Sequence, residues 1–191
     1  MGLPELTVPA AAKGSRTVTV FGSPSPREGE VAYEEARRLG MRLAAAGFTL
    51  CNGGYGGTME AAARGAREAG GIAVGVTFPD PGGRKPNPWL HREIRCGSLL
   101  ERVQSLIAQG DATIIPPGGT GTLLELSAVW ELMSKGFVER RPLVLLGAFW
   151  EGVVGAMREQ LIREGRTDAA SLPVTAADAS QAVAELLRFF T

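Results

Sequence analysis

The sequence has few of the residues that build disulfide frameworks or zinc sites. It contains two cysteines, Cys51 and Cys96, and one histidine, His91, in 191 residues. A disulfide-rich scaffold needs several cysteine pairs, and a zinc site needs clustered cysteine and histidine ligands, so both are excluded. His91 has no evident partner in its proline-containing stretch, and we expect a solvated or structural role for it. The sequence therefore predicts no metal site and no cofactor.

The sequence also lacks net charge and any long hydrophobic run. Twenty basic residues balance twenty acidic ones, so no broad positive field is present to hold nucleic acid or an anionic membrane. No apolar segment approaches the length that spans a bilayer, and residues 1–16 have no signal-peptide core. We expect a cytoplasmic protein with a flexible tail over residues 1–16, a single domain over residues 17–191, and a small-molecule ligand.

A regular alternation of apolar runs and amphipathic segments sets the expected fold class. Short apolar runs that end at glycine or proline predict strands, and apolar residues at helical spacing predict helices. The expected strands are 17–21, 48–51, 72–76, 112–115 and 142–146, with another near 172–175. The expected helices are 30–46, 59–69, 99–109, 122–134, 150–163 and 178–190. The alternation favours a Rossmann-like α/β fold, a doubly wound parallel sheet with helices on both faces.

The most specific motif is the glycine loop that follows the strand 112–115. Its backbone amides and a threonine hydroxyl can surround a phosphate at the start of the next helix. The loop lacks the Gly-Lys-Ser/Thr ending of a nucleoside-triphosphate loop and differs from the dinucleotide fingerprint. We therefore expect a monophosphate ligand. The candidate phosphate-binding residues are Gly118, Gly119, Thr120, Gly121 and Thr122.

Another glycine loop, the first along the chain, follows the strand 48–51 and includes Gly53 and Gly54. Glycines there let a ligand approach the backbone, and the helix that follows offers free N–H groups. A tight turn with close strand-to-helix packing explains the same glycines equally well. The irregular, proline-rich segment 78–90 is expected to form one wall of a site.

Two charged residues are candidates for chemistry. Glu125 falls one helical turn beyond the phosphate loop, where its carboxylate can face a sugar or its leaving base. An ordinary acid that complements the helix dipole fits the same position. Arg102 lies on the preceding expected helix, and from its position alone a solvated residue or an ion-pair partner is favoured over a catalytic group.

These motifs resemble the LOG ("lonely guy") family of Rossmann-like proteins. Residues 117–125 match its PGGxGTxxE signature at every fixed position. The first glycine loop resembles the family's GGGxGxMEAA form, with Asn52 in place of the first glycine, and Phe21-Gly22-Ser23 resembles the ending of its first strand. Val103 and Leu124 replace a lysine and a second glutamate that are common in the family. The resemblance covers roughly residues 17–146.

The resemblance implies an activity and a site. Family members hydrolyse cytokinin riboside 5′-monophosphates, or related nucleoside 5′-monophosphates, to free base and ribose 5-phosphate. Their catalytic pair is an arginine and the signature glutamate, which match Arg102 and Glu125. Ser23 joins the expected nucleotide-binding residues, and the resemblance also implies a homodimer.

Related proteins suggest two other functions. Molybdenum cofactor carrier proteins resemble this family in fold and glycine loops, and a non-catalytic nucleotide or cofactor carrier is the main alternative. Family members also carry the name lysine decarboxylase, but a pyridoxal enzyme needs a suitably placed lysine. None of the three lysines, Lys13, Lys85 and Lys135, has an evident buried setting, so we reject that activity.

Overall fold

The computed structural model describes residues 15–191. The tail expected over residues 1–16 therefore lies outside the described residues, apart from its last two. Both of these contact the domain: Ser15 Oγ donates a hydrogen bond to the carbonyl of Gly47 (2.8 Å), and the Arg16 guanidinium lies 4.0 Å from the centre of the Phe190 ring.

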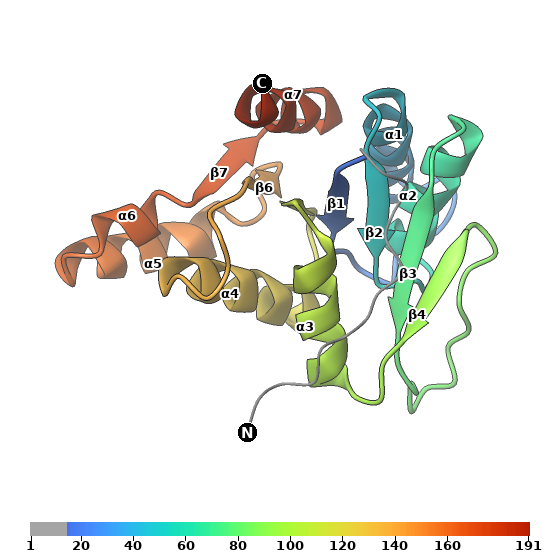
Figure 1. Ribbon diagram of the computed structural model, residues 1–191, viewed down its shortest axis with the longest axis horizontal. Helices are drawn as coiled ribbons and strands as arrows, with labels where there is room; N and C mark the ends of the chain where they lie inside the picture. The colour runs from blue at the N-terminus through green and yellow to red at the C-terminus, as the bar shows by residue number, and fades with distance from the viewer. Residues whose placement is uncertain (1–14) are drawn as a thin grey trace.

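A seven-stranded sheet forms the centre of the molecule, and every neighbouring pair of strands is parallel (Figure 1). The strand order is β4-β3-β2-β1-β5-β6-β7. The strands are β1 (Thr17–Val20), β2 (Thr49–Asn52), β3 (Ala73–Thr77), β4 (Arg92–Arg95), β5 (Ala112–Ile115), β6 (Leu143–Leu146) and β7 (Pro173–Ala176). This is the parallel sheet that the alternating sequence predicts.

Helices cover both faces of the sheet. They are α1 (Val31–Ala45), α2 (Thr58–Glu68), α3 (Leu99–Gln109), α4 (Thr120–Ser134), α5 (Glu151–Arg163), α6 (Thr167–Ala170) and α7 (Ala179–Phe190). One buried cluster joins α1, α2 and α7 to one face, and a second joins α3, α4 and α5 to the other. Figure 1 accordingly shows α4, α5 and α6 together on the side away from α1 and α2. The predicted doubly wound architecture is confirmed.

The central strand β1 shows how the sequence separates the two faces. Val18 and Val20 belong to the cluster beneath α1 and α2, and Thr19, between them, points to the opposite face because side chains alternate along a strand. The Thr19 hydroxyl donates a hydrogen bond to the Leu106 carbonyl of α3 (2.9 Å). A polar residue is tolerated in the core at this position because its donor is paired.

Two elements differ from the sequence prediction. Residues 92–95 form the edge strand β4, which the sequence did not indicate because Arg-Glu-Ile-Arg has a single apolar residue and an edge strand needs only one covered face. The four-residue helix α6 is too short to show a periodicity. The short strand expected near 172–175 is present as β7, and α4 begins at Thr120, two residues earlier than predicted.

The strand order has a switch point between β1 and β5, which is where ligands bind in this class of fold. The chain leaves β1 toward β2 on one side and later returns to β5 on the other, so the loops after β1 and β5 separate at the middle of the sheet. Ligands of open α/β sheets bind outside the carboxyl ends of the strands at such a switch point. The loop after β5 carries the glycine motif of residues 117–122, for which the sequence predicts phosphate binding.

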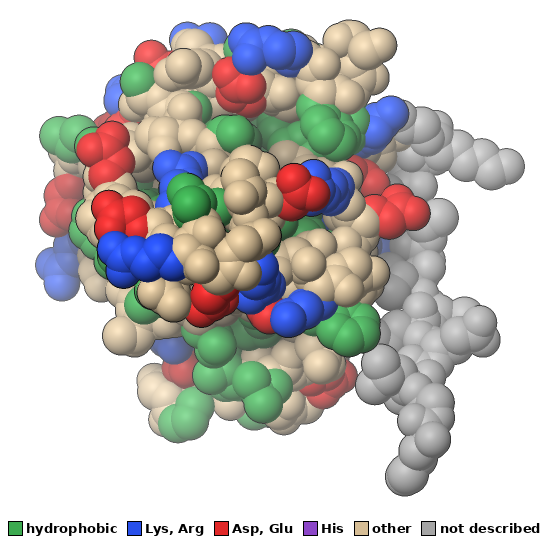
Figure 2. Space-filling model, turned by 90° about the vertical axis from the view of Figure 1, so that its left-hand side faces the viewer, with side chains coloured by type: hydrophobic (Ala, Val, Ile, Leu, Met, Phe, Trp, Pro, Cys, Tyr) green, Lys and Arg blue, Asp and Glu red, His purple; other side chains and the backbone are tan. Residues whose placement is uncertain are grey.

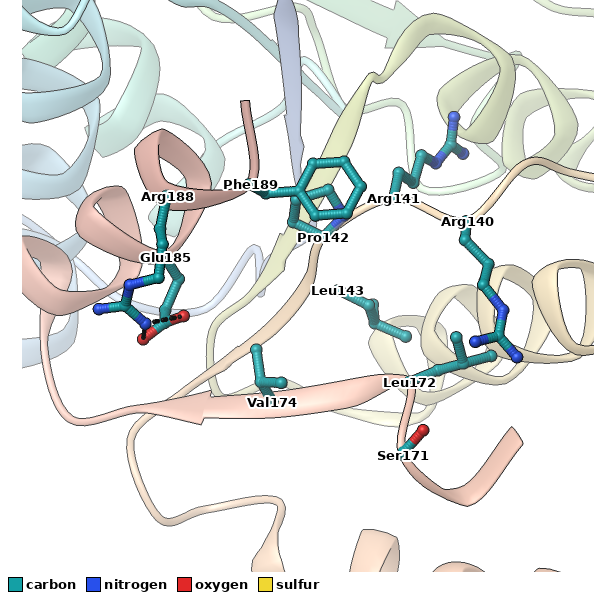
Figure 3. Close-up of a pocket in the computed structure, with 10 residues that line it drawn as sticks. All are labelled: Arg140, Arg141, Pro142, Leu143, Ser171, Leu172, Val174, Glu185, Arg188 and Phe189. Carbon is teal, nitrogen blue, oxygen red and sulfur yellow. Dashed lines mark hydrogen bonds and ion pairs between the residues drawn. The ribbon is translucent and has the colours of Figure 1, made fainter. Parts of the chain in front are cut away.

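A pocket of about 430 Å³ lies at the opposite, amino ends of β6 and β7 (Figure 3). Leu143 and Val174 line it from the two strands, and Phe189 lies beside it. The Arg188–Glu185 ion pair, 2.8 Å long, is at its rim. Because it opens at the amino ends of the strands, this pocket is separate from the switch point.

The surface carries no large field of one sign on the face that Figure 2 presents. Acidic, basic and hydrophobic side chains lie interspersed there, as the equal numbers of basic and acidic residues in the chain lead one to expect. Within residues 15–191, no helix is both long and apolar enough to cross a bilayer.

Candidate active site

The glycine loop after β5 leads into α4 and leaves the start of that helix open. Gly119 is the N-cap residue, its backbone is extended, and no side chain caps the helix. The first amides of a helix have no intrahelical partners, and the helix dipole adds positive potential at this end. The loop therefore offers a phosphate both N–H donors and favourable charge.

The glycines of this loop fall into two kinds. A Cβ on Gly118 would lie 2.2 Å from Thr122 Oγ1, so the packing of the turn requires glycine there. A Cβ on Gly119 or Gly121 would meet no atom within 4 Å. Packing does not explain these two glycines, and the space beside them is available to a ligand. The buried Thr122 hydroxyl lies 3.4 Å from the Gly22 carbonyl and ties α4 to the loop after β1.

The loop after β1 brings Ser23 to the same end of the sheet. The amide of Ser23 donates to Thr58 Oγ1 (2.9 Å), and the amide of Thr58 donates to the Ser23 carbonyl (2.9 Å). These bonds hold the loop against the start of α2. The Ser23 hydroxyl accepts a hydrogen bond from the amide of Ser25 (3.2 Å), which leaves its own proton to donate.

Arg102 and Glu125 form a buried ion pair between α3 and α4. Arg102 Nη1 lies 3.3 Å from Glu125 Oε1, and the two residues are 7% and 6% exposed. Arg102 also donates from Nε to the Val76 carbonyl (2.8 Å) and from Nη2 to the Gly53 carbonyl (3.2 Å). The guanidinium is thus fixed by the ends of β2 and β3 as well as by the carboxylate. The structure brings together the two residues that the resemblance names as catalytic.

The first glycine loop forms the seat of this arginine. A Cβ on Gly53 would lie 1.8 Å from Arg102 Nη2, so the guanidinium reaches its position only past a glycine. Gly54 has a φ of +76° and donates its amide to Asn52 Oδ1 (2.8 Å), and Asn52 Nδ2 donates to the Met59 carbonyl (2.8 Å). Asn52, which replaces a family glycine, therefore braces the turn. Direct phosphate binding by Gly53 and Gly54 stays a prediction.

Burial changes the acidity of Glu125. Desolvation raises the pKa of its carboxyl to about 7, and the charge of Arg102, which favours the ionised form, opposes this rise. A carboxyl that titrates near neutral pH exchanges protons readily under physiological conditions, as general acid–base chemistry requires. The perturbed pKa and the charged partner together mark this pair as a functional-site candidate.

Two aromatic residues complete the surroundings of Arg102, and little in the sequence indicated them. The guanidinium carbon lies 5.6 Å from the centre of the Tyr55 ring and 5.7 Å from that of Phe78. The Tyr55 hydroxyl donates to the Phe78 carbonyl (2.6 Å), which locks the two loops together. The only sequence signal was a tyrosine inside a glycine loop.

Val103 and Leu124, the two residues that depart from the LOG pattern, are apolar, unlike the neighbouring Arg102 and Glu125. Val103 is buried in the core cluster shared by α3, α4 and α5, whereas Leu124 is 39% exposed on α4. Both are compatible with the fold as it stands. Among residues 15–191, no group of three or more His, Cys, Asp or Glu side chains gathers in a metal-binding arrangement.

Comparison with known families bears on this arrangement directly. The profile of the SLOG cluster4 family matches residues 15–181, which is most of the chain. The chain belongs to the SLOG cluster4 family. This SLOG cluster4 protein is 35% identical over 127 residues to the cytokinin riboside 5′-monophosphate phosphoribohydrolase of Mycobacterium tuberculosis, covering 61% of the chain and 63% of the relative. It is 32% identical over 150 residues to the enzyme of the same name from Mycobacterium marinum, covering 73% of the chain and 75% of the relative. The resemblance to the LOG family is confirmed.

Solved structures agree on the fold. The molybdenum cofactor binding protein of Rippkaea orientalis superimposes with a TM-score of 0.72, covering 94% of this chain and 100% of that one. The two sequences are 21% identical. A similarity at 21% identity shows that the two proteins have the same fold, and proteins of one fold can have different functions.

Proposed function

We propose that this SLOG cluster4 protein hydrolyses the N-glycosidic bond of a nucleoside 5′-monophosphate to give free base and ribose 5-phosphate. The observation that carries the proposal is the buried Arg102–Glu125 pair, one helical turn beyond an uncapped and open helix N-terminus. The mycobacterial relatives named as phosphoribohydrolases support it. The chain spans 63% of the M. tuberculosis relative, so the activity is proposed from the site as well as from the names.

The phosphate would bind at the start of α4. The free amides beside Gly119 and Gly121 would hold its oxygens, and the Ser23 hydroxyl would add a donor from the loop after β1. Binding at this distance from the reacting bond fixes the sugar in place and lowers the entropic cost of reaching the transition state.

Glu125 would act on the sugar. As the bond between C1′ and the base nitrogen breaks, the base leaves with the electron pair and positive charge builds on the ribose ring. An ionised Glu125 stabilises that charge or positions and deprotonates the water that attacks C1′. The base takes up a proton as it departs, so that free base and ribose 5-phosphate are formed.

Arg102 would act through Glu125 and the substrate. Its hydrogen bonds to Val76 and Gly53 leave Nη1 directed at the carboxylate. A charge-assisted bond of this kind fixes the carboxylate's orientation and favours its ionised form.

We further propose that the protein is a homodimer, as the LOG resemblance implies. A groove between α4 and α5 is lined by Leu123, Trp130, Val153 and Met157 among others, and Val153 and Met157 are about half exposed, at 47% and 49%. Apolar side chains grouped on two helices are typical of a covered interface. Light scattering should give twice the monomer mass, and Met157→Glu should reduce it to the monomer value. A monomeric unaltered protein at micromolar concentration would contradict this proposal.

A cytoplasmic location is proposed with this activity. Cys51 and Cys96 are both free and buried, which is compatible with a reducing compartment. Cytokinin riboside 5′-monophosphates are proposed as one class of substrate, because the mycobacterial relatives are named as phosphoribohydrolases of these compounds.

The test is base release from AMP and from isopentenyl-AMP, each compared with its nucleoside, which lacks the phosphate. The proposal expects release from the monophosphates and release from the nucleosides slower by about 100-fold or more, because remote phosphate binding supplies much of the alignment. Nucleotide binding without any base release would instead favour the carrier alternative that the fold of the R. orientalis protein illustrates.

A further inference from the structure

A second pocket, of about 240 Å³, lies next to the catalytic pair at the carboxyl end of β3 and along β4. Thr77 and Phe78 line it from the end of β3, and Glu93 lines it from β4. The loop 78–90 closes it with Arg84 and Pro86. The function described so far makes no use of this pocket.

Two residues that line the pocket also contact Arg102. Tyr55 and Phe78 line it, and both rings lie within 6 Å of the Arg102 guanidinium carbon. The phosphate loop follows β5, and β3 lies three strands away in the sheet order. Three strand spacings correspond to about 14 Å. A nucleotide held at the start of α4 and extended past Glu125 and Arg102 would have its base within reach of this pocket.

The lining suits a flat, hydrogen-bonding ring. Arg84 is anchored by Asp80 (2.7 Å), and its guanidinium lies 5.1 Å from the centre of the Tyr55 ring, so a planar cation is held at the mouth. Guanidinium planes and aromatic rings are the surfaces on which proteins stack nucleobases. Phe78 adds a second aromatic ring to the lining, packed edge-on against Tyr55 with the ring centres 6.4 Å apart.

Glu93 is the carboxylate among the polar residues that line the pocket, which also include Thr77, Arg84 and Arg95. One of its oxygens accepts the Thr77 hydroxyl proton (2.6 Å), and the other accepts from Arg95 Nε (3.1 Å). The side chain is 23% exposed. A carboxylate has room for about four hydrogen bonds, so each oxygen retains a free lone pair. These two bonds hold the carboxylate in place with acceptor capacity to spare, and an ionised carboxylate offers no donor.

We infer that this pocket holds the nucleobase and that Glu93 selects bases bearing an exocyclic amino group over bases with a carbonyl at the same position. An amino group donates to the carboxylate, as the amino group of cytosine does in carboxylate readout of nucleic acids. A carbonyl oxygen at the same position would face the Glu93 carboxylate, and because both groups are acceptors no hydrogen bond could form. The inference rests on the proposed function, because it takes the ligand to be a nucleoside 5′-monophosphate.

The experiment measures dissociation constants and kcat/KM for AMP and IMP, which differ in amino against carbonyl at one ring position. We expect the unaltered protein to prefer AMP, and Glu93→Gln to reduce the AMP-to-IMP ratio by roughly 10-fold or more, since the amide can donate to the carbonyl of IMP. Glu139→Gln, an exposed glutamate on the loop after α4, is the matched control and should leave the ratio unchanged.

A second variant tests the stacking wall independently. Arg84→Ala should weaken AMP and IMP alike by roughly 5-fold, within the range of a single base-stacking contact. It should leave the affinity for ribose 5-phosphate, which has no base, unaltered. The Arg84 side chain is 46% exposed, so its removal takes little packing from the core, and the unchanged affinity for ribose 5-phosphate also shows that the variant is folded.

The outcomes separate this inference from the proposed function. An unchanged AMP-to-IMP ratio in Glu93→Gln, with base release intact, overturns the inference and leaves the activity standing. A ratio of binding constants that falls in Glu93→Gln, without base release from any nucleotide, supports the pocket and removes the hydrolase. Failure of the unaltered protein to bind either nucleotide overturns both.

Discussion

Replacement of Glu125 by glutamine tests the buried carboxyl without any assumption about substrate. Burial raises the pKa of Glu125 to about 7, against 4.5 for an ordinary glutamate. In the pH range between these values the unfolded chain has released the proton and the folded chain still holds it, so the unfolded state gains stability as the pH rises. The contribution of this carboxyl to folding is therefore fully present below pH 4.5 and is lost as the pH rises through 7.

The magnitude follows from the two pKa values. Each pH unit of difference corresponds to about 1.4 kcal/mol, so between pH 5 and pH 8 the unaltered protein should lose about 2–3 kcal/mol relative to Glu125→Gln. The constant cost of changing the partner of Arg102 is the same at both pH values and cancels. Other titrating groups, such as His91, whose pKa is lowered by burial and by Arg67, occur in both proteins and cancel too.

The assay is urea unfolding of both proteins at pH 5, 6, 7 and 8, with the difference in unfolding free energy plotted against pH. Glu68→Gln is the control, because the hydrogen bond from Arg37 holds the pKa of that carboxyl below its usual value, so its contribution to stability is lost only in acid and the difference for this variant should stay nearly constant from pH 5 to pH 8. A difference for Glu125→Gln that stays constant from pH 5 to pH 8 would refute the reasoning, since the carboxyl would then titrate as if it were in water.

Three further substitutions have expected results. Gly53→Ala places a methyl group against Arg102 Nη2 and should lower kcat/KM by about 10-fold or more, because the guanidinium loses its orientation. The affinity for the nucleotide should not change, and equal losses of kcat/KM and affinity would indicate general misfolding. Gly155→Ala, in the open middle of α5, should raise the melting temperature by about 2–4 °C, and an unchanged or lower value in calorimetry would be contrary to expectation. Ser98→Ala removes the hydroxyl that accepts a hydrogen bond from the Glu101 amide at the start of α3, and it should lower the free energy of unfolding in urea by about 1 kcal/mol. An unchanged free energy of unfolding would show that this cap does not stabilise the protein.

The order of strands and helices could be predicted from the sequence because the buried strands are short, almost wholly apolar and bounded by glycine or proline. β5 and β6 are examples, with Ala-Thr-Ile-Ile and Leu-Val-Leu-Leu completely buried. β4 could not be predicted, because its partly exposed edge position accepts Arg92, Glu93 and Arg95. Its pairing with β3 supplies what its composition lacks.

The candidate site was predictable only in part, and for a physical reason. Glu125 and the loop before it are contiguous and carry a recognisable signature. Arg102 needed the family spacing, because its contacts with Gly53, Val76 and Glu125 join segments between 23 and 49 residues apart. No local pattern reports such contacts, and the requirement for glycine at residue 53 becomes visible only when the guanidinium is in place.

The account rests most directly on the Arg102–Glu125 pair, and one measurement tests it. Base release from AMP is followed under single-turnover conditions for the unaltered protein, Glu125→Ala and Arg102→Ala, with the dissociation constant of AMP measured for each. If the pair is catalytic, both variants bind AMP within about tenfold of the unaltered protein and release base at least about 100-fold more slowly, as expected for groups that act in the transition state. Base release by Glu125→Ala at the unaltered rate would contradict it.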